Sequence, residues 1–492
     1  MIAADQRTVV GRLDPSALQI DLRRPSRTSG FHRTARVSTT PARGSSTRMT
    51  GRAAAAVAVL ASVLSLGACA CGEATATDKA KPTAAAAEVA TPVTPDTATP
   101  ELALSLSADD SATGRRIAAA QAAVREHPDV IEAYTALASA LLKRRRETSN
   151  AVFLTYAQDV LTAAERRAPG DAAVGLLTAM VLLEQHRFLD AADKARRLAV
   201  ALPNDPTPHL VLGDALLELG EYEASADAVQ AAMNLRPDLR SYNRAAHMRW
   251  LYGDFDGALT IMDLAIDAGS ARDPEGQAWC FADLGAMYLA QGDARRAAAS
   301  ADRALTLLPG YVPGLVVQSK AQAAQGDAAA AIATLSDAVE RRPAAEDLLT
   351  LSEWLDDAQR PEEAAQRRQQ GQRLAEDDPR PVAHFLARHD ERPDEALRLA
   401  ELELAARKNI AAHDTHALAL LRNGRLVEAS AAMDKAMALG TLDANLLLHA
   451  GLIQAAAGDP GRAKTSLSRA LSLDASVDPR LVAELRKDLG DA

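Results

Sequence analysis

Aromatic residues and cysteines are scarce in this chain of 492 residues, and both shortages narrow the possible folds. Only 3% of the residues are Phe, Trp or Tyr, which is too few for a β-sandwich core, whereas the abundant Ala, Leu, Arg, Glu and Gln favour helices. The three cysteines are too few for a disulfide framework and wrongly spaced for a zinc ribbon: Cys69, Cys71 and Cys280. We therefore expect an all-α protein.

Acidic residues outnumber basic residues in the chain as a whole, but not near the N-terminus. The chain has 55 Lys and Arg and 65 Asp and Glu, a formal net charge of −10. The first 68 residues hold 10 Arg and 3 Asp, which leaves 45 basic and 62 acidic residues, a net charge near −17, for the remainder. Such an acidic body disfavours nucleic acid and anionic bilayer surfaces as partners. We expect no nucleic-acid partner.

An apolar stretch near the N-terminus indicates export. Fourteen apolar or small residues, Ala53 to Leu66, follow Arg52 and several earlier arginines, as in the central region of a signal peptide. The next residues complete Leu66-Gly67-Ala68-Cys69, which resembles the lipobox of bacterial lipoproteins. In that family the cysteine sulfur receives a diacylglycerol and becomes the mature N-terminus. The resemblance implies lipidation at Cys69 and a location on the outer face of the cytoplasmic membrane.

This reading divides the N-terminal region into three segments and leaves alternatives open. Residues 1–48 are an untranslated or disordered extension if translation starts at Met49, 49–68 are the signal peptide, and 69–107 are a disordered tether rich in Ala, Thr and Pro. The apolar stretch could instead remain as an uncleaved transmembrane anchor. If the stretch is never translated, the protein is cytoplasmic.

Prolines and glycines recur with a period of 34 residues in the rest of the chain. Pro169, Pro203 and Pro237 show this spacing, and Gly292 and Gly326 repeat it. A 34-residue period is the signature of tetratricopeptide repeats. It predicts pairs of helices that stack into an elongated array.

The segment from Ala278 to Pro309 resembles the tetratricopeptide family at seven diagnostic positions: Leu284, Gly285, Tyr288, Gly292, Ala297, Ala304 and Pro309. The resemblance implies an α-solenoid of about ten antiparallel helix-turn-helix repeats that form a right-handed superhelix in residues 108–477. A helix in residues 478–492 then caps the array. The first repeat has an extra stretch of about seven residues around Arg145, a longer loop is expected around Gly269, and two irregular repeats lie between Glu346 and Asn409.

In similar proteins the first helix of each pair lines the concave surface, where extended or helical peptides bind. The resemblance therefore implies a non-enzymatic scaffold that binds an unidentified partner protein or peptide there. Aromatic residues and arginine dominate interface energies, so Arg244, Tyr252 and Trp279 are the expected anchors, although Trp279 could instead pack between repeats. The full expected contact set is Leu210, Asp214, Leu217, Arg244, Met248, Tyr252, Trp279, Leu289 and Lys320.

No linear motif indicates catalysis, a cofactor or a metal. His413 and His416 lie one helical turn apart, but no third zinc ligand is near in sequence. Cys280 has no nearby histidine to act as its base and is expected to be a buried, inert thiol. The rival hypothesis is an enzyme or small-ligand receptor whose site is assembled across repeats. A closed pocket that gathers ionisable residues would favour this rival.

Overall fold

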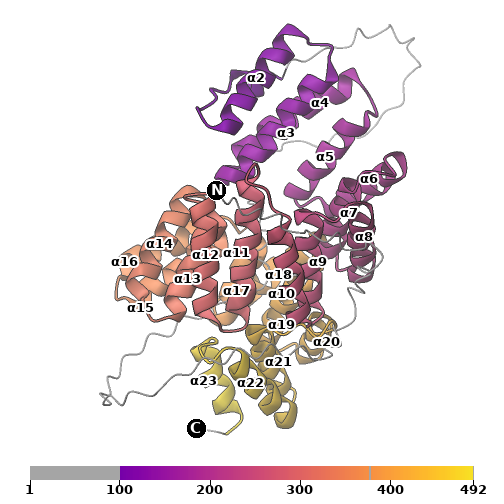
Figure 1. The fold of residues 1–492 in the computed structure, drawn as a ribbon. Helices are drawn as coiled ribbons and strands as arrows, with labels where there is room; N and C mark the ends of the chain where they lie inside the picture. Colours follow the sequence, from indigo (N-terminus) through magenta and orange to yellow (C-terminus); the bar gives the residue numbers. More distant parts are fainter. Residues whose placement is uncertain (1–99, 376–377, 491–492) are drawn as a thin grey trace, which may run out of the picture.

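The computed structural model describes residues 100–375 and 378–490, where it consists of helices without any strand (Figure 1). The expected extension, signal peptide, Cys69 and nearly all of the tether lie outside these residues. The helices are α1 Glu101–Ser105, α2 Ala112–Glu126, α3 Ile131–Thr148, α4 Val152–Arg167, α5 Ala172–Glu184, α6 Phe188–Ala201, α7 Thr207–Glu218, α8 Tyr222–Leu235, α9 Leu239–Leu251, α10 Phe255–Asp267, α11 Pro274–Ala290, α12 Ala294–Leu307, α13 Val312–Ala324, α14 Ala328–Arg341, α15 Ala345–Asp357, α16 Pro361–Gln372, α17 Pro379–Arg388, α18 Pro393–Ala406, α19 Ile410–Arg422, α20 Leu426–Ala436, α21 Ala444–Ala456, α22 Pro460–Leu473 and α23 Pro479–Asp488.

Helices α3 to α22 form ten successive pairs, preceded by α2 and followed by α23. The predictions of an all-α solenoid and of about ten helix pairs are thus confirmed. The short helix α1 begins at Glu101, so the end of the range assigned to the tether is helical. No helix in the described part of the chain combines the length and apolarity that a membrane crossing requires.

The pair α11–α12 illustrates how the sequence builds each repeat. Gly292 has a φ of +70° and turns the chain, a conformation that glycine adopts without steric cost. The Asp293 carboxylate then caps α12 by accepting from the backbone N–H of Arg296. Ala297 and Ala304 are fully buried, because small side chains let the two helices approach closely.

The two irregular repeats also fold as helix pairs, α15–α16 and α17–α18. Gln359 replaces the usual turn glycine between α15 and α16 and keeps a positive φ of 59°. The extra stretch around Arg145 lengthens α3, which runs to Thr148. The longer loop expected around Gly269 is present, because Ala268–Asp273 connects α10 to α11 without helix.

The solenoid curls until later repeats touch earlier ones, so that α18 to α22 pack beside α7 to α12 (Figure 1). The backbone N–H of Lys408 donates to the Glu218 carbonyl over 2.8 Å. Further along, the Thr441 hydroxyl donates to the Leu251 carbonyl over 2.5 Å. We call this line of contacts the closure seam. It converts an open array into a closed body.

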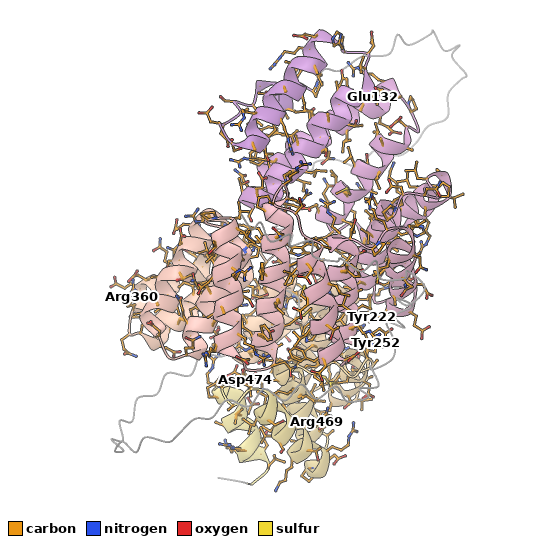
Figure 2. The ribbon with its side chains drawn as sticks, in the orientation of Figure 1. Glu132, Tyr222, Tyr252, Arg360, Arg469 and Asp474 are labelled. Atoms are coloured by element: carbon orange, nitrogen blue, oxygen red, sulfur yellow. The ribbon has the colours of Figure 1, made fainter. Side chains whose placement is uncertain are left out.

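Two separate hydrophobic clusters show where the closed body begins. The largest cluster combines buried residues from α8 to α23, with Tyr222 and Tyr252 packed against it near the closure seam (Figure 2). Residues of α1 to α5 form a cluster of their own around Tyr134 and Leu137. We call α1–α4 the arm and α5–α23 the body; the arm extends away from the body (Figure 1).

Candidate ligand-binding chamber

Closure turns the concave face of the solenoid into an internal chamber of about 270 Å³. Its wall is formed by the first helices of eight successive pairs, α3 to α17, together with Arg407 and Asn409 beside the closure seam. The prediction that first helices line the concave surface is therefore confirmed. The later repeats curl back onto the earlier ones, and the chamber remains partly open to solvent.

Ionisable side chains dominate the chamber wall, which contains seven arginines and eight carboxylates. Most of the arginines are paired across neighbouring helices. Arg145 contacts Glu184 at 2.7 Å, and Arg407 contacts Glu218 at 2.8 Å. Such a collection of convergent charged groups is typical of a site that binds a polar ligand.

Burial weakens the acidity of several wall carboxyls. It holds the pKa of Asp283 well above its usual range, although the Asn243 amide donates to Asp283 over 2.7 Å. Burial likewise raises the pKa of Asp378 to about 6, and it raises the pKa of Glu184 and of Glu218 despite their arginine partners. Burial thus disfavours the charged form of these carboxyls, and the arginine partners of Glu184 and Glu218 oppose that effect.

One corner of the chamber holds a cluster of arginines around an aromatic ring. Arg244 makes a two-pronged contact with Asp214, with N–O distances of 2.6 and 2.5 Å, and its guanidinium lies 5.3 Å from the centre of the Trp279 ring. This combination of ion pair and cation–π contact fixes Arg244 in place.

Arg240 lies one turn before Arg244 and has a different environment. Its side chain is solvent-accessible, and it forms no ion pair with a carboxylate of the described residues. Partial burial of the guanidinium and the nearby charges of Arg146 and Arg244 lower its pKa, whereas the carboxylates of Asp273 and Glu275 raise it. Because Arg240 is exposed and has no ion pair of its own among the described residues, its guanidinium can bind an anionic group.

The predicted contact residues divide into those that reach the chamber and those that do not. Asp214, Arg244 and Trp279 line it together. Leu217 borders a smaller cavity beside Trp279, and Tyr252 is half-buried against the main core.

The remaining predicted contacts face the protein interior. Leu210, Met248 and Leu289 are buried, which corrects the expectation that their side chains face a partner. Lys320 is also buried and pairs with Glu346 at 3.2 Å. Hydrophobic periodicity alone does not separate such core positions from the wall of a chamber, because both lie on the first helix.

Other sequence expectations concern cysteine and tryptophan. Cys280 is buried, and burial raises the pKa of its thiol, as expected for an inert thiol. Trp250 and Trp354 are both buried. Sequence reasoning did not identify Arg240 and Asp283 as residues of the chamber wall. The pair Arg240 and Arg244, one turn apart on a first helix, is the signal that could have identified this corner.

A second group of polar residues lies away from the chamber, on α17, α19 and α21. Donor atoms of His384, Asp414 and His449 all lie within 4.8 Å of one another. His413 and His416, the pair considered from sequence as zinc ligands, are not part of this group. Asp414, which lies between them in the sequence, does belong to the group. The three positions are separated by about one repeat along the chain, which is the signal that sequence reasoning overlooked.

No protein-family model and no curated protein sequence matches the chain. Among solved structures, it is similar to the human IFIT1 dimer with PPP-AAAA, at 14% identity and a TM-score of 0.43 over 75% of this chain and 96% of that chain. The human IFIT1 dimer with m7Gppp-AAAA matches at 15% identity and 0.44, over 77% and 95%. The Cut9–Hcn1 hetero-tetramer of the APC/C matches at 15% identity and 0.31, over 79% and 98%. These similarities concern the fold alone.

The expectation that excluded nucleic acid as a partner is wrong as stated. Two of these similar structures contain PPP-AAAA and m7Gppp-AAAA. The physical reason lies in how charge is distributed. The whole chain is acidic, but binding depends on the local potential at a site, so the net charge of the chain does not exclude nucleic acid.

Proposed function

We propose that the protein is a non-catalytic repeat scaffold whose chamber binds a short acidic segment of a partner protein. One observation carries this proposal: the Arg240 guanidinium lines the chamber and forms no ion pair with a carboxylate of the described residues. Trp279 provides an adjacent aromatic surface. An acidic group at Arg240 would lower the electrostatic cost of three neighbouring arginines, and an apolar side chain beside it would cover the Trp279 ring.

The size of the chamber supports a segment rather than a folded surface. Its volume of about 270 Å³ is near the lower limit of about 300 Å³ for small-molecule sites. A chain end or a few extended residues match this volume, whereas a folded domain cannot enter it. The partner therefore offers a terminus or loop.

A small polar ligand is the second candidate. The enclosed volume and the many convergent ionisable groups favour it. The two candidates share the chemistry of an anionic group bound at Arg240, and they differ in what that group is attached to. The identity of the bound molecule decides between them.

A photocrosslinking residue placed in the chamber tests the proposal. We would introduce it at Ala286, which lines the chamber, and at Val427, which is 85% exposed on the outer helix α20. After irradiation of cells that produce the protein, we expect an adduct at position 286 and none at position 427. Mass spectrometry then identifies the adduct as protein, small molecule or nucleic acid.

Charge reversal provides the matched control. Arg240→Glu should abolish the adduct at position 286, because it replaces the proposed anchor with a repelling charge. Arg295→Glu makes the same change at an exposed position on α12 and should leave the adduct intact. An adduct that survives Arg240→Glu would overturn the proposed anchor, and a metabolite in place of a protein would establish the second candidate.

We also propose that the scaffold is anchored by lipid at Cys69 on the outer face of the cytoplasmic membrane. The support is the sequence Leu66-Gly67-Ala68-Cys69 behind an apolar stretch. Metabolic labelling with a clickable fatty acid should mark the native protein and not Cys69→Ala. A label that persists in Cys69→Ala would contradict lipidation at this residue.

A further inference from the structure

Three successive first helices in the body place metal-binding side chains at corresponding positions. His384 lies on α17, Asp414 on α19 and His449 on α21. Stacking of the repeats brings one donor atom from each of them within 4.8 Å of the other two. Two imidazoles and a carboxylate are a donor set that divalent transition metals prefer.

The spacing within the group is close to that of metal ligands. His449 Nδ1 lies 2.9 and 3.0 Å from the two oxygens of Asp414. Two ligands that each sit about 2.1 Å from one tetrahedral ion are roughly 3.3 Å apart. The His384 ring meets the His449 ring edge-on, with centroids 5.5 Å apart, so a rotamer adjustment of His384 completes the set.

Burial favours binding by the side chains over binding by water. His449 is 1% exposed and Asp414 is 4% exposed. The ring nitrogen of His449 that faces Asp414 is already within 2.9 Å of a carboxylate oxygen. Solvent therefore competes little for an ion at this place.

The surrounding charges are compatible with a cation. Arg388 is near His384, but it is paired with Asp478 at 2.6 Å and with Glu353 at 3.4 Å. The buried Asp443 adds a carboxyl close to Asp414 and His449. The local positive charge is therefore largely compensated.

We propose that His384, Asp414 and His449 bind one divalent transition metal ion, with zinc as the reference ion. In this site the ion lies between His449 Nδ1, one Asp414 oxygen and a ring nitrogen of His384, and it takes the place of the proton on Nδ1, which moves to Nε2. The ion ties α17, α19 and α21 together. This inference is independent of the proposed function, because the site is separate from the chamber.

Metal titration of the purified, tag-free chain tests the inference. The protein is treated with EDTA, dialysed and titrated with zinc by calorimetry, and bound metal is then counted by mass spectrometry. We expect one equivalent of zinc and a higher melting temperature after zinc addition. Cobalt in place of zinc should produce visible absorption bands of a site with nitrogen ligands.

Matched variants assign the ligands. Asp414→Asn and His384→Ala should each weaken zinc binding at least about tenfold and remove the thermal shift, with circular dichroism confirming that they fold. His416→Ala lies on the same helix as Asp414 but outside the group, and it should bind zinc like the native chain. Absence of stoichiometric zinc in the native protein, or undiminished binding in folded Asp414→Asn, would overturn the inference. The native titration gives this answer even if a variant fails to fold.

Discussion

The arm and the body are built from the same kind of helix pair, yet they are held together differently. The arm has a cluster of its own and reaches the rest of the body chiefly through α5 and a few ion pairs to α11. The body adds the closure seam between repeats that are far apart in sequence. An open solenoid is stabilised by neighbouring repeats alone. Closure therefore gives the body a continuous line of contacts between distant repeats, whereas the arm contributes only the end of α3 to the chamber wall and takes no part in the closure seam.

The largest expected effect comes from breaking the closure seam at Arg407. Its side chain is 10% exposed and pairs with Glu218 at 2.8 Å and with Glu403 at 3.0 Å. Arg407→Ala leaves both carboxylates buried without their cation, so we expect a loss of about 3–5 kcal/mol in unfolding free energy. Urea denaturation measures this loss.

Arg425→Ala is the matched control for this change. Arg425 also bridges two carboxylates, Glu401 and Glu428, but its side chain is 41% exposed. Solvent screens exposed pairs, so the variant should differ little from the native protein. Equal losses in the two variants would mean that the closure seam adds nothing to the stability of the body.

A second long-range contact joins the C-terminal helix to α15 and predicts a pH dependence. Arg388, His389 and Arg480 surround Glu353, and they outweigh burial and the nearby Asp357 to lower its pKa from 4.5 to about 2. Because the folded pKa is the lower one, its contribution is fully present above about pH 4.5. It is lost as the pH falls toward 2, and it amounts to about 3 kcal/mol.

Glu353→Gln should remove this component of acid sensitivity. We would measure unfolding free energy at pH 5 and pH 3 for the native protein, for Glu353→Gln and for Glu340→Gln, whose side chain is 64% exposed. The difference between the two pH values should shrink only in Glu353→Gln. An unchanged difference would show that Glu353 is not the titrating group.

Turn glycines on and off the closure seam allow a finer comparison. Gly253 and Gly326 have φ values of +74° and +86°. Replacing either glycine by a residue with a side chain lowers the stability of the protein by about 1 kcal/mol through backbone strain alone. A Cβ at Gly253 would lie 2.7 Å from the Gly440 carbonyl oxygen, whereas nothing lies within 4 Å of one at Gly326.

Gly253→Ala should therefore destabilise the protein by roughly 1–2 kcal/mol more than Gly326→Ala. Thermal and urea denaturation of the two variants measure the difference. If both variants lose the same amount, the opposing turns do not touch in solution, and the chamber is open at this edge.

Sequence periodicity predicts each repeat but not how repeats far apart meet. The spacing of Gly292 and Gly326 specified the helix pairs, since a repeat is defined by local turns and packing. By contrast, the Asn409 amide donates to Glu218, which lies 191 positions away in the sequence. No local pattern encodes that contact. The candidate site divides in the same way. Arg244 and Trp279 were identified from residue type on the first helices, whereas Arg240 was missed because its environment is formed by charged residues of other helix pairs, such as Arg146 and Glu275.

The smallest expected effect lies at the junction between arm and body. Lys143 on α3 pairs with Asp273 before α11 at 2.9 Å and with Glu147 at 3.7 Å. These pairs are partly exposed, so Lys143→Ala should cost at most about 1 kcal/mol. Its effect on hydrogen exchange should be confined to the arm, because the arm has few other links to the body. Amides of α2–α4 should exchange faster while those of α19–α22 stay unchanged.

Lys435→Ala removes an exposed lysine on α20 and should alter neither region. Faster exchange throughout the body in Lys143→Ala would contradict the separation between the two regions. The arm would then be a full part of the closed structure, and its ion pairs to α11 would help to hold the chamber closed.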